Sequence, residues 1–425
     1  MPNIKQRGPI SPAAVSYRDA TLYSERFGDI YFSVEGGEDE ARHVFLSGNG
    51  LPARWRDRDR FTIVETGFGC GLNFLLTWSA FRDYAPAGAR LHFVSVEKHP
   101  FRLADLERIH GAWPQFEKLS RELAGAYPPL IEGYHRLHLD GGRVTLTLLF
   151  GDALEMLSEL EARSDAFYLD GFAPSKNPDM WSRALCAELG RLAGPGATAA
   201  TYSVAGTVRD ALAQAGFVVE KRTGFGRKRE MLAAAFPGVS IIAPRAQRRA
   251  AVIGAGIAGT QCALALARRG FEVELFESTA RVAACTSANP AGLVRPFLTL
   301  DEGARSRFTW DAFFYAQRNH AALSHCHAQP LWGPTGVLQL ARDSTHLEKM
   351  QRSLAQIAIP AGLARPVDAS TGAALCGAPI AGPGVWFEGA GWVRGRAACE
   401  AALHAAGDRV TLRFSTKVSG LQQRD

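Results

Sequence analysis

The sequence predicts two α/β domains in tandem, each built on a parallel β-sheet that binds a ligand at one edge. Two glycine-rich turns carry this prediction, at residues 67–71 and 254–259, because each follows a short β-branched strand and precedes a helix. Carboxylates at the ends of later strands are the third observation, since open parallel sheets bind ligands at their carboxyl edge. The two turns differ in glycine spacing, so the two halves are predicted to differ in fold.

Length and composition are those of a globular protein with two domains. The 425 residues are 47% hydrophobic and 21% charged, which allows a sizeable core. No apolar run approaches the length of a membrane span, and the first residues lack the apolar stretch of a secretory signal. The seven cysteines form no C-x-x-C pair, which favours reduced thiols and a cytoplasmic location. The net charge of +6 permits an anionic partner such as RNA without establishing one.

The first glycine turn lies in the segment RFTIVETGFGCGLNFLLTW. FTIVE predicts a strand, and the leucine spacing after the turn predicts a helix over residues 72–81. Gly67, Gly69 and Gly71 allow the backbone to pass close to a ligand at the start of that helix.

Three further strands are predicted from the segments LHFVSVE, VTLTLLF and DAFYL. Glu97 ends the first of these, and Asp152 and Asp170 follow the other two. A carboxylate at the end of the second strand suits a ribose, because it accepts hydrogen bonds from both hydroxyls. Residues 196–203 predict a fifth strand, followed by a helix at 208–217 and an antiparallel hairpin.

The E-x-G-x-G-x-G form of the first turn resembles the first motif of class I S-adenosylmethionine-dependent methyltransferases. The order of strands and the closing hairpin agree with that resemblance. It implies that the cofactor is S-adenosyl-L-methionine. The residues predicted to contact it are Glu65, Gly67, Gly69, Gly71, Asn73, Glu97, Lys98, Asp152, Ala153, Phe172 and Pro174.

A second nucleotide-binding pattern follows the polar, proline-containing joint IIAPRAQRRA. The segment AAVIGAGIAGTQCALALARRGFEVELFES predicts a strand, a glycine turn, a helix and a strand ending in an acid. Gly254, Gly256 and Gly259 allow the tight turn, the approach of a pyrophosphate and close helix packing. Glu277 is placed for an adenosine ribose, so the pattern predicts a dinucleotide-binding domain.

The next segment, CTSANPAGLVRPF, favours FAD over NAD. Its small and polar residues would let backbone amides approach an isoalloxazine ring; they are Thr286, Ser287, Asn289, Ala291 and Gly292. This preference draws on a resemblance to flavoproteins of the D-amino-acid-oxidase type. The alternative is a surface connection marked by glycine and proline.

Longer strings resemble one family in particular. They are YFSVEGGEDEARHVFLSGN, ETGFGCGLNFLLTW, FVSVEKHP, LDGGRVTLTLLFGDA, LDGFAPSKNPDMW, GFGRKREML and GWVRGRAACEAAL, in this order along the chain. Nearly the whole chain is thereby similar to the bifunctional enzymes of tRNA 5-methylaminomethyl-2-thiouridine biosynthesis, in which a methyltransferase is fused to an FAD-dependent oxidoreductase.

The resemblance implies two reactions on the wobble uridine of tRNA. An FAD-dependent oxidoreductase domain, residues 249–425, would remove the carboxymethyl group from 5-carboxymethylaminomethyl(-2-thio)uridine to give 5-aminomethyl(-2-thio)uridine. A methyltransferase domain, residues 1–240, would then methylate the exposed amine, with residues 241–248 as linker. The family's chains are longer, so the oxidoreductase domain is expected to be C-terminally incomplete. We expect a monomer.

Asp170 is predicted to be the catalytic residue of methyl transfer. An alkylamine has a pKa of about 10 and is mostly ammonium near neutral pH, which leaves no lone pair to attack a methyl group. Asp170, at the end of the fourth strand, could orient the amine and accept its proton. Phe172 and the loop 174–178 would exclude water or stack on the uracil. The alternative is that Asp170 only caps a turn through Gly171.

Four basic residues are predicted to contact the tRNA substrate. Arg295 could grip the substrate carboxylate with two hydrogen bonds, or pair with a flavin phosphate, or lie on the surface. Arg227, Lys228 and Arg229 lie in the hairpin and could neutralise tRNA phosphates, although a solvated basic turn is equally consistent.

A metal site and two other functions are the alternatives to this interpretation. The segment HAALSHCHAQ contains three histidines and a cysteine but lacks the spacing of metal ligands, so no metal is predicted. A small-molecule amine methyltransferase fused to an amino-acid oxidase is the alternative function, and a non-enzymatic tRNA-binding protein is a second one.

Overall fold

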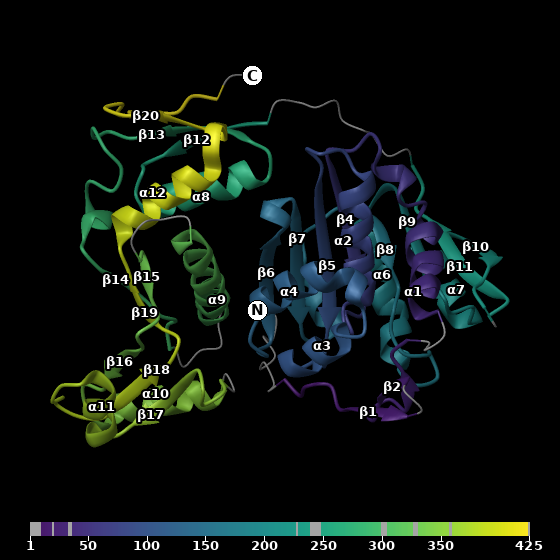
Figure 1. Ribbon diagram of the computed structural model, residues 1–425, viewed down its shortest axis with the longest axis horizontal. Helices are drawn as coiled ribbons and strands as arrows, with labels where there is room; N and C mark the ends of the chain where they lie inside the picture. The colour runs from purple at the N-terminus through teal and green to yellow at the C-terminus, as the bar shows by residue number, and fades with distance from the viewer. Residues whose placement is uncertain are drawn as a thin grey trace. The chain divides into compact units, whose positions relative to one another are not determined.

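The computed structural model describes residues 10–18, 21–32, 36–226, 228–238, 248–298, 304–325, 330–356 and 359–423. The chain divides into two compact units, an N-terminal one of Ile10–Arg245 and a C-terminal one that holds Ala246–Asp425 (Figure 1). Most of the predicted linker lies outside the described residues.

An eight-stranded mixed sheet forms the centre of the N-terminal unit. Its strands, in spatial order, are β10 (Val218–Thr223), β11 (Glu230–Ala235), β9 (Ala193–Thr201), β8 (Ser164–Tyr168), β4 (Arg60–Glu65), β5 (Arg90–Glu97), β7 (Val144–Phe150) and β6 (Gly133–Leu139). The five strands from β9 to β7 are parallel, whereas β6 and β11 run antiparallel to their neighbours. The chain leaves β4 toward β5 and later returns to β8 on its other side, which creates a topological switch point beside β4.

Buried side chains cover both faces of this sheet. Along β8, Ala166 and Tyr168 join one apolar cluster and Phe167 joins the other, as alternation along a strand requires. The helices that contribute to the first cluster are α1 (Gly37–Ala41), α2 (Leu72–Tyr84), α3 (Leu103–His110) and α4 (Glu117–Ala126). Those of the second are α5 (Ala153–Ser158), α6 (Arg183–Leu192) and α7 (Gly206–Gln214). The unit is thus a three-layer α/β/α domain.

The predicted elements of this unit are confirmed, and one strand of the central sheet was missed. A small antiparallel sheet of β1 (Val15–Arg18), β2 (Thr21–Ser24) and β3 (Asp29–Ile30) was not predicted either. The five predicted strands are β4, β5, β7, β8 and β9, the two predicted helices are α2 and α7, and β10 and β11 form the hairpin. The missed strand is β6, whose residues alternate between buried and partly buried. Three residues with positive φ, Asp140, Gly141 and Gly142, connect it to β7, and such a D-G-G turn is a hairpin signal that sequence reasoning could have used.

The C-terminal unit begins with the predicted nucleotide-binding pattern. Strands β12 (Arg249–Ile253), β13 (Glu272–Phe276) and β20 (Val410–Arg413) form a parallel sheet. The helices α8 (Ile257–Arg268) and α12 (Gly395–Ala406) contribute to the apolar cluster beside it. β20 thus adds a third parallel strand beside β13, from a segment far along the chain.

The rest of this unit contains two small antiparallel sheets and three helices (Figure 1). One sheet has the order β14 (Gly292–Val294), β19 (Gly391–Val393), β15 (Trp332–Gly333), and the other β16 (Val337–Leu340), β18 (Gly384–Phe387), β17 (Ala364–Val367). The helices are α9 (Ala304–Ser324), α10 (Ser344–Gln356) and α11 (Ala369–Cys376). Within the described ranges, no helix is both long and apolar enough to cross a membrane.

Candidate active site of methyl transfer

A cavity of about 350 Å³ lies at the carboxyl ends of β4, β5, β8 and β9. Residues at or after the ends of these strands line it, and residues of the segments 29–32 and 37–45, together with Lys228, complete its walls. This is the edge of the sheet, and the switch point, at which open α/β folds bind ligands. Its volume lies in the range of small-molecule and cofactor sites.

Glu97 organises the glycine turn. Its Oε2 accepts a hydrogen bond from the Gly69 amide at 2.8 Å, and its Oε1 accepts one from the His99 amide at 2.8 Å. Burial raises the pKa of Glu97, and these backbone donors act against that rise. Each carboxylate oxygen has a second lone pair, so Glu97 can hold the turn and still accept from the diol of a ribose.

The glycines are required by close approach and by backbone conformation. A Cβ at Gly67 would lie 3.3 Å from the carbonyl oxygen of Asp170. Gly71 has φ of 80° directly before α2, and a Cβ there would lie 2.8 Å from the Phe68 ring. The turn therefore runs closer to β8 than a larger residue would permit, as expected for a backbone that approaches a ligand.

Asp170 lies in the wall of this cavity. Its Oδ1 accepts from the Gly171 amide at 2.8 Å, and its Oδ2 accepts from the Asn73 side-chain amide at 2.7 Å. Burial raises the pKa of Asp170 to about 6, against the lowering effect of these two donors and of the Lys228 charge. Asp170 therefore does cap the turn through the Gly171 amide, and its carboxylate still lines the cavity. The two readings of Asp170 are therefore compatible.

Glu65 lies behind Asn73 and does not line the cavity. The Asn73 amide donates to Glu65 Oε1 at 2.9 Å, and the Ser95 hydroxyl donates to Glu65 Oε2 at 2.6 Å. Burial raises the pKa of Glu65 to about 8. One amide group thus bridges two carboxyl groups, and Glu65 orients the Asn73 side chain that holds Asp170.

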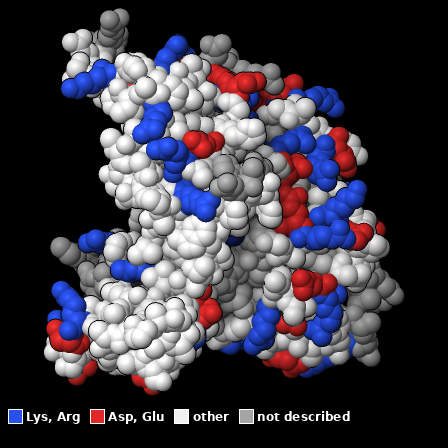
Figure 2. Space-filling model, turned by 60° about the vertical axis from the view of Figure 1, so that its left-hand side comes forward, with Lys and Arg blue, Asp and Glu red and all other residues white. Residues whose placement is uncertain are grey.

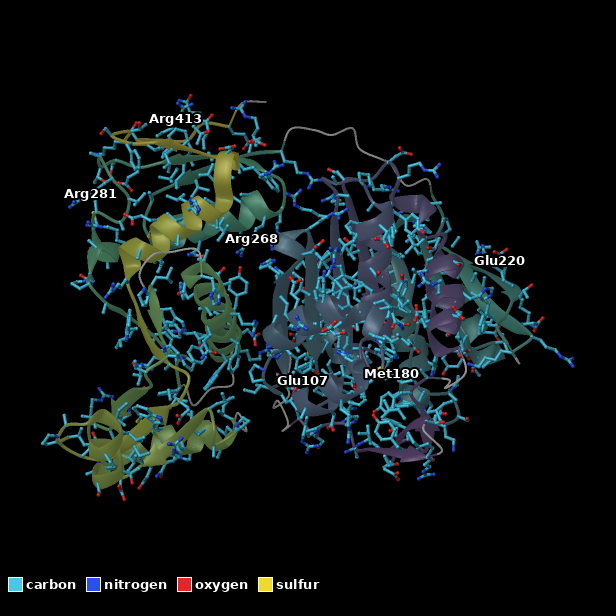
Figure 3. All side chains as sticks on the ribbon, in the orientation of Figure 1. Glu107, Met180, Glu220, Arg268, Arg281 and Arg413 are labelled. Atoms are coloured by element: carbon cyan, nitrogen blue, oxygen red, sulfur yellow. The ribbon has the colours of Figure 1, made fainter. Side chains whose placement is uncertain are left out.

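Phe172 also lines the cavity, as predicted. Its ring stacks on Phe27 with centroids 4.6 Å apart and meets the edge of Tyr31 at 5.1 Å. The backbone beside it is fixed as well, because the amide of Ala173 donates to Asp29 at 3.1 Å. Met180 packs beside Gly171, 3.6 Å from where a Cβ would stand (Figure 3). The rings of Phe172, Phe27 and Tyr31 thus form an aromatic wall next to Asp170.

Six predicted cofactor residues do not line the cavity. Glu65 lies behind Asn73 and Gly71 lies directly before α2; the other four are Lys98, Asp152, Ala153 and Pro174. The Lys98 ammonium pairs with Asp152 at 2.9 Å, and Asp152 also accepts from the Leu154 amide at 3.1 Å as the N-cap of α5. Neither of these two residues lines the cavity, and neither do Ala153 and Pro174. Their predicted contacts with S-adenosyl-L-methionine find no support in the position of the cavity.

Sequence reasoning gave no role to several residues of the cavity wall. These are Asp29, Tyr31, Glu40 and Tyr202. Tyr202 directly follows β9, so its place at the carboxyl end of a predicted strand was a usable signal. The other three precede the first glycine turn, and no periodicity marks them.

Of the predicted basic turn, Lys228 alone lines the cavity among the described residues. Its ammonium pairs with Glu40 at 2.7 Å. Arg229 is exposed, and Arg227 lies outside the described residues.

The second glycine turn is built in a similar way. The amide of Ala255 donates to Glu277 Oε2 at 2.8 Å, and the Thr279 amide donates to Oε1 at 2.8 Å. A Cβ at Gly259 would lie 1.8 Å from the carbonyl oxygen of Gly254, so α8 packs against the turn only with glycine there. Gly254 has φ of 95° with open space beside it, which leaves room for a pyrophosphate.

The loop after β13 reaches this turn through Ser287. The Ser287 hydroxyl accepts from the Ile257 amide at 3.0 Å and lies 3.1 Å from where a Cβ of Gly256 would stand. Asn289 is exposed, and Gly292 begins β14, where it pairs with Val393 of β19. The loop is thus held against the glycine turn rather than being a free surface connection.

Arg295 packs among aromatic rings. Its guanidinium lies 5.4 Å from the ring centroid of Phe297 and 5.8 Å from that of Phe387, and it donates to the carbonyl oxygen of Pro296 at 3.0 Å. Burial lowers the pKa of Arg295. Its predicted role in binding a carboxylate remains a proposal.

The histidine-rich segment ends α9. His320 is buried with its ring 6.0 Å from that of Trp332, and Cys326 and His327 lie outside the described residues. In the part of the chain that the structure describes, no three His, Cys, Asp or Glu side chains are grouped as a metal site would require.

Family models match both units. Residues 114–237 match the family described as S-adenosyl-L-methionine-dependent methyltransferase, and residues 249–425 match the one described as FAD dependent oxidoreductase. The fold, the cavity and these matches define a methyltransferase domain followed by an FAD-dependent oxidoreductase domain. The two cofactors are those predicted from the sequence.

Curated relatives match nearly the whole chain. The tRNA 5-methylaminomethyl-2-thiouridine biosynthesis bifunctional protein MnmC of Thiobacillus denitrificans is 49% identical over 97% of this chain and 66% of its own length. The protein of the same name from Azoarcus sp. is 48% identical over 97% of this chain and 65% of its own length. Among solved structures, MNMC2 from Aquifex aeolicus has 23% identity and a TM-score of 0.44, covering 55% of this chain and 75% of that one.

The chain therefore belongs to the family of these bifunctional proteins, which confirms the resemblance noted from the sequence. It spans slightly less than two thirds of the length of these two relatives.

Proposed function

We propose that this chain modifies the wobble uridine of tRNA in two steps. The domain at 249–425 removes the carboxymethyl group of 5-carboxymethylaminomethyl-2-thiouridine, and the domain at 1–240 methylates the resulting amine, with 241–248 as the linker. The support is the family of the chain and the two sites, of which the first contains the candidate base Asp170.

The position of Asp170 is the observation that carries the methyl-transfer step. S-adenosyl-L-methionine, when bound, supplies an electrophilic methyl group. The residues that would hold it are the glycine turn, with its backbone close to β8, and Glu97, with lone pairs for a ribose. The substrate nitrogen must be neutral to form the new N–C bond. Asp170 accepts the proton that the nitrogen loses, and a carboxylate whose pKa is raised to about 6 is a better base than an ordinary aspartate.

Orientation comes from the surroundings of Asp170. Asn73 and the Gly171 amide fix both carboxylate oxygens, while Phe172 and Tyr31 offer ring surfaces against which a pyrimidine can stack. A carboxylate that is held in place beside aromatic rings suits a substrate whose amine is attached to a planar nucleobase. Positioning of this kind supplies much of the rate of methyl transfer.

In the C-terminal unit, FAD supplies a hydride acceptor for the carbon next to the substrate nitrogen. Gly254, Gly259 and Glu277 fit its pyrophosphate and ribose, and Ser287 ties the adjoining loop to them. We propose that Arg295, which packs beside two aromatic rings, binds the substrate carboxylate.

The distribution of charged side chains bears on where tRNA phosphates could bind. On the face drawn in Figure 2, acidic and basic side chains lie interspersed, and no continuous basic field is visible among the described residues. The Lys228 ammonium already pairs with Glu40. Arg229, in the same predicted turn, is exposed, and we propose it as the residue that contacts a phosphate. We further propose a cytoplasmic location, which agrees with the six described cysteines being unpaired. We also propose that the protein is a monomer.

The test is methyl transfer by the full chain to tRNA from a strain that lacks this activity, with free alkylamines as competing acceptors. We expect a methyl group on the wobble uridine of tRNA and little transfer to the amines. Transfer to the amines alone would instead support the small-molecule methyltransferase. No binding of S-adenosyl-L-methionine by calorimetry would support a non-enzymatic protein.

A further inference from the structure

The ammonium group of Lys228 enters the cavity from the turn between β10 and β11. Its Nζ lies 2.7 Å from Glu40 Oε1 and 4.1 Å from the centroid of the Tyr202 ring. Lys228, Glu40, Tyr202 and Asp170 all line the cavity. A cation thus lies between a carboxylate and an aromatic face, on the side of the cavity where the candidate base is found.

Each wall of this cation site is held from a different element. Glu40 comes from α1, and its side chain is only 16% exposed. Tyr202 follows β9, and its hydroxyl donates to the carbonyl oxygen of Gly171 at 2.5 Å, which fixes the ring beside Asp170. Of these three side chains, that of Lys228 can be displaced most easily, because its charge is carried on a flexible four-carbon stem and it is 48% exposed.

The site is selective for a cation on electrostatic grounds. Asp29, Glu40, Glu97 and Asp170 place four carboxyl groups in the cavity wall, whereas Lys228 is the single Lys or Arg among the described residues that line it. The face of an aromatic ring attracts an ammonium group, and a carboxylate nearby strengthens that attraction. The protonated amine of an aminomethyl nucleobase has the same charge and the same hydrogen-bond donors as Lys228.

We propose that Glu40 and the Tyr202 ring, next to Asp170, bind the protonated amine of the substrate, and that the Lys228 ammonium competes with it for this position. The inference rests on the proposed methylation of an amine and adds the residues that would select it. Glu40 and Tyr202 bind the cation, and Asp170 then receives its proton. Glu40 and the Tyr202 ring therefore favour acceptors that carry a cation over neutral ones, and Lys228 lowers the affinity for such an acceptor by competing with it.

The test is calorimetry with the free nucleosides 5-aminomethyluridine and, as its neutral counterpart, 5-hydroxymethyluridine, on the full chain saturated with S-adenosyl-L-methionine. Nucleosides lack phosphates, so a phosphate contact of Lys228 does not enter the measurement. Lys228→Met should bind the aminomethyl nucleoside about fivefold more tightly than the unaltered protein does and leave the hydroxymethyl nucleoside unchanged. Glu40→Gln should weaken the aminomethyl nucleoside by a similar factor.

Lys221→Met is the matched control, because Lys221 forms an exposed pair with Glu230 at 2.8 Å in the same hairpin and does not line the cavity. It should behave as the unaltered protein. Equal or weaker binding of the aminomethyl nucleoside by Lys228→Met, with S-adenosyl-L-methionine still bound, would overturn the proposal. So would an equal gain for the hydroxymethyl nucleoside. Failure of the chain to methylate tRNA would refute the proposed function and leave this binding preference measurable.

Discussion

The two glycine turns use the same contact in different surroundings. In the N-terminal unit, Glu97 accepts from the Gly69 amide at 2.8 Å, and in the C-terminal unit Glu277 accepts from the Ala255 amide at 2.8 Å. In each case the acid that ends the second strand first organises the backbone of the turn. Its role toward a ribose is added to that structural role.

The surroundings of the two acids shift their pKa values in opposite directions. Burial dominates at Glu97 and raises its pKa. At Glu277 the largest single effect is again burial, which is slight there, and together the hydrogen bonds from Ala255, Thr279 and Ser278 outweigh it and lower the pKa. The same motif therefore gives an enclosed carboxylate within a cavity and a more exposed, more strongly hydrogen-bonded one. The enclosed site is where chemistry by a perturbed carboxyl group is expected.

The largest effect is expected for Asp170, which has no counterpart in the second turn. Asp170→Asn should keep the bond from Gly171 but lose the ability to accept a proton. We expect methyl transfer to tRNA at pH 7 to fall by about 100-fold or more, with the affinity for S-adenosyl-L-methionine within twofold. Transfer of labelled methyl groups and calorimetry measure the two quantities.

Asp179→Asn is the control for that change, because Asp179 is exposed on the same loop. It should retain full activity. Equal rates for Asp170→Asn and the unaltered protein would return Asp170 to its turn-capping role alone.

Neutralising each of the two acids in turn tests how much each contributes to cofactor binding. Either Glu97→Gln or Glu277→Gln places a side-chain NH₂ where a carboxylate oxygen accepted a hydrogen bond. The loss should be greater in the enclosed site, about tenfold in the dissociation constant of S-adenosyl-L-methionine against about threefold for FAD. Both constants are accessible by calorimetry or, for FAD, by visible absorbance.

Glu107→Gln serves as the neutral reference, because Glu107 is exposed on α3 (Figure 3). A greater loss at Glu277 than at Glu97 would mean that enclosure does not decide how much each acid contributes.

How far the sequence predicted this molecule depends on the kind of contact. Strands, glycine turns and strand-end acids were predicted because local patterns encode them, and Asp170, Glu97 and Phe172 do line the cavity. Glu40 was not predicted to line it, because its segment, residues 37–45, reaches the cavity only through tertiary packing. Glu65 was predicted to contact the cofactor, whereas the fold buries it behind Asn73.

A further effect is expected at Glu65, on stability and not on activity. A folded-state pKa of about 8 lies well above that of an exposed glutamate, so the folded state binds the proton more tightly. The free energy of unfolding should therefore fall as pH rises from about 4.5 to 8, by at most about 1.4 kcal/mol per pH unit from this group. Glu65→Gln should remove that slope.

Hydrogen exchange of the β4 and β5 amides in the full chain, measured at several pH values, reports this free energy. Parallel pH slopes in Glu65→Gln and the unaltered protein would show that Glu65 is already ionised in the folded state.

The most direct test of the account is the pH dependence of methyl transfer in a single turnover, with the full chain saturated with S-adenosyl-L-methionine and tRNA. If Asp170 receives the proton of the bound ammonium, the rate should rise between pH 5 and 7 with a midpoint of about 6 and then level off. In Asp170→Asn the amine must lose its proton to solvent, so the rate should keep rising toward the pKa of the amine, about 10. Profiles of the same shape in both proteins would contradict the central claim that Asp170 is the base.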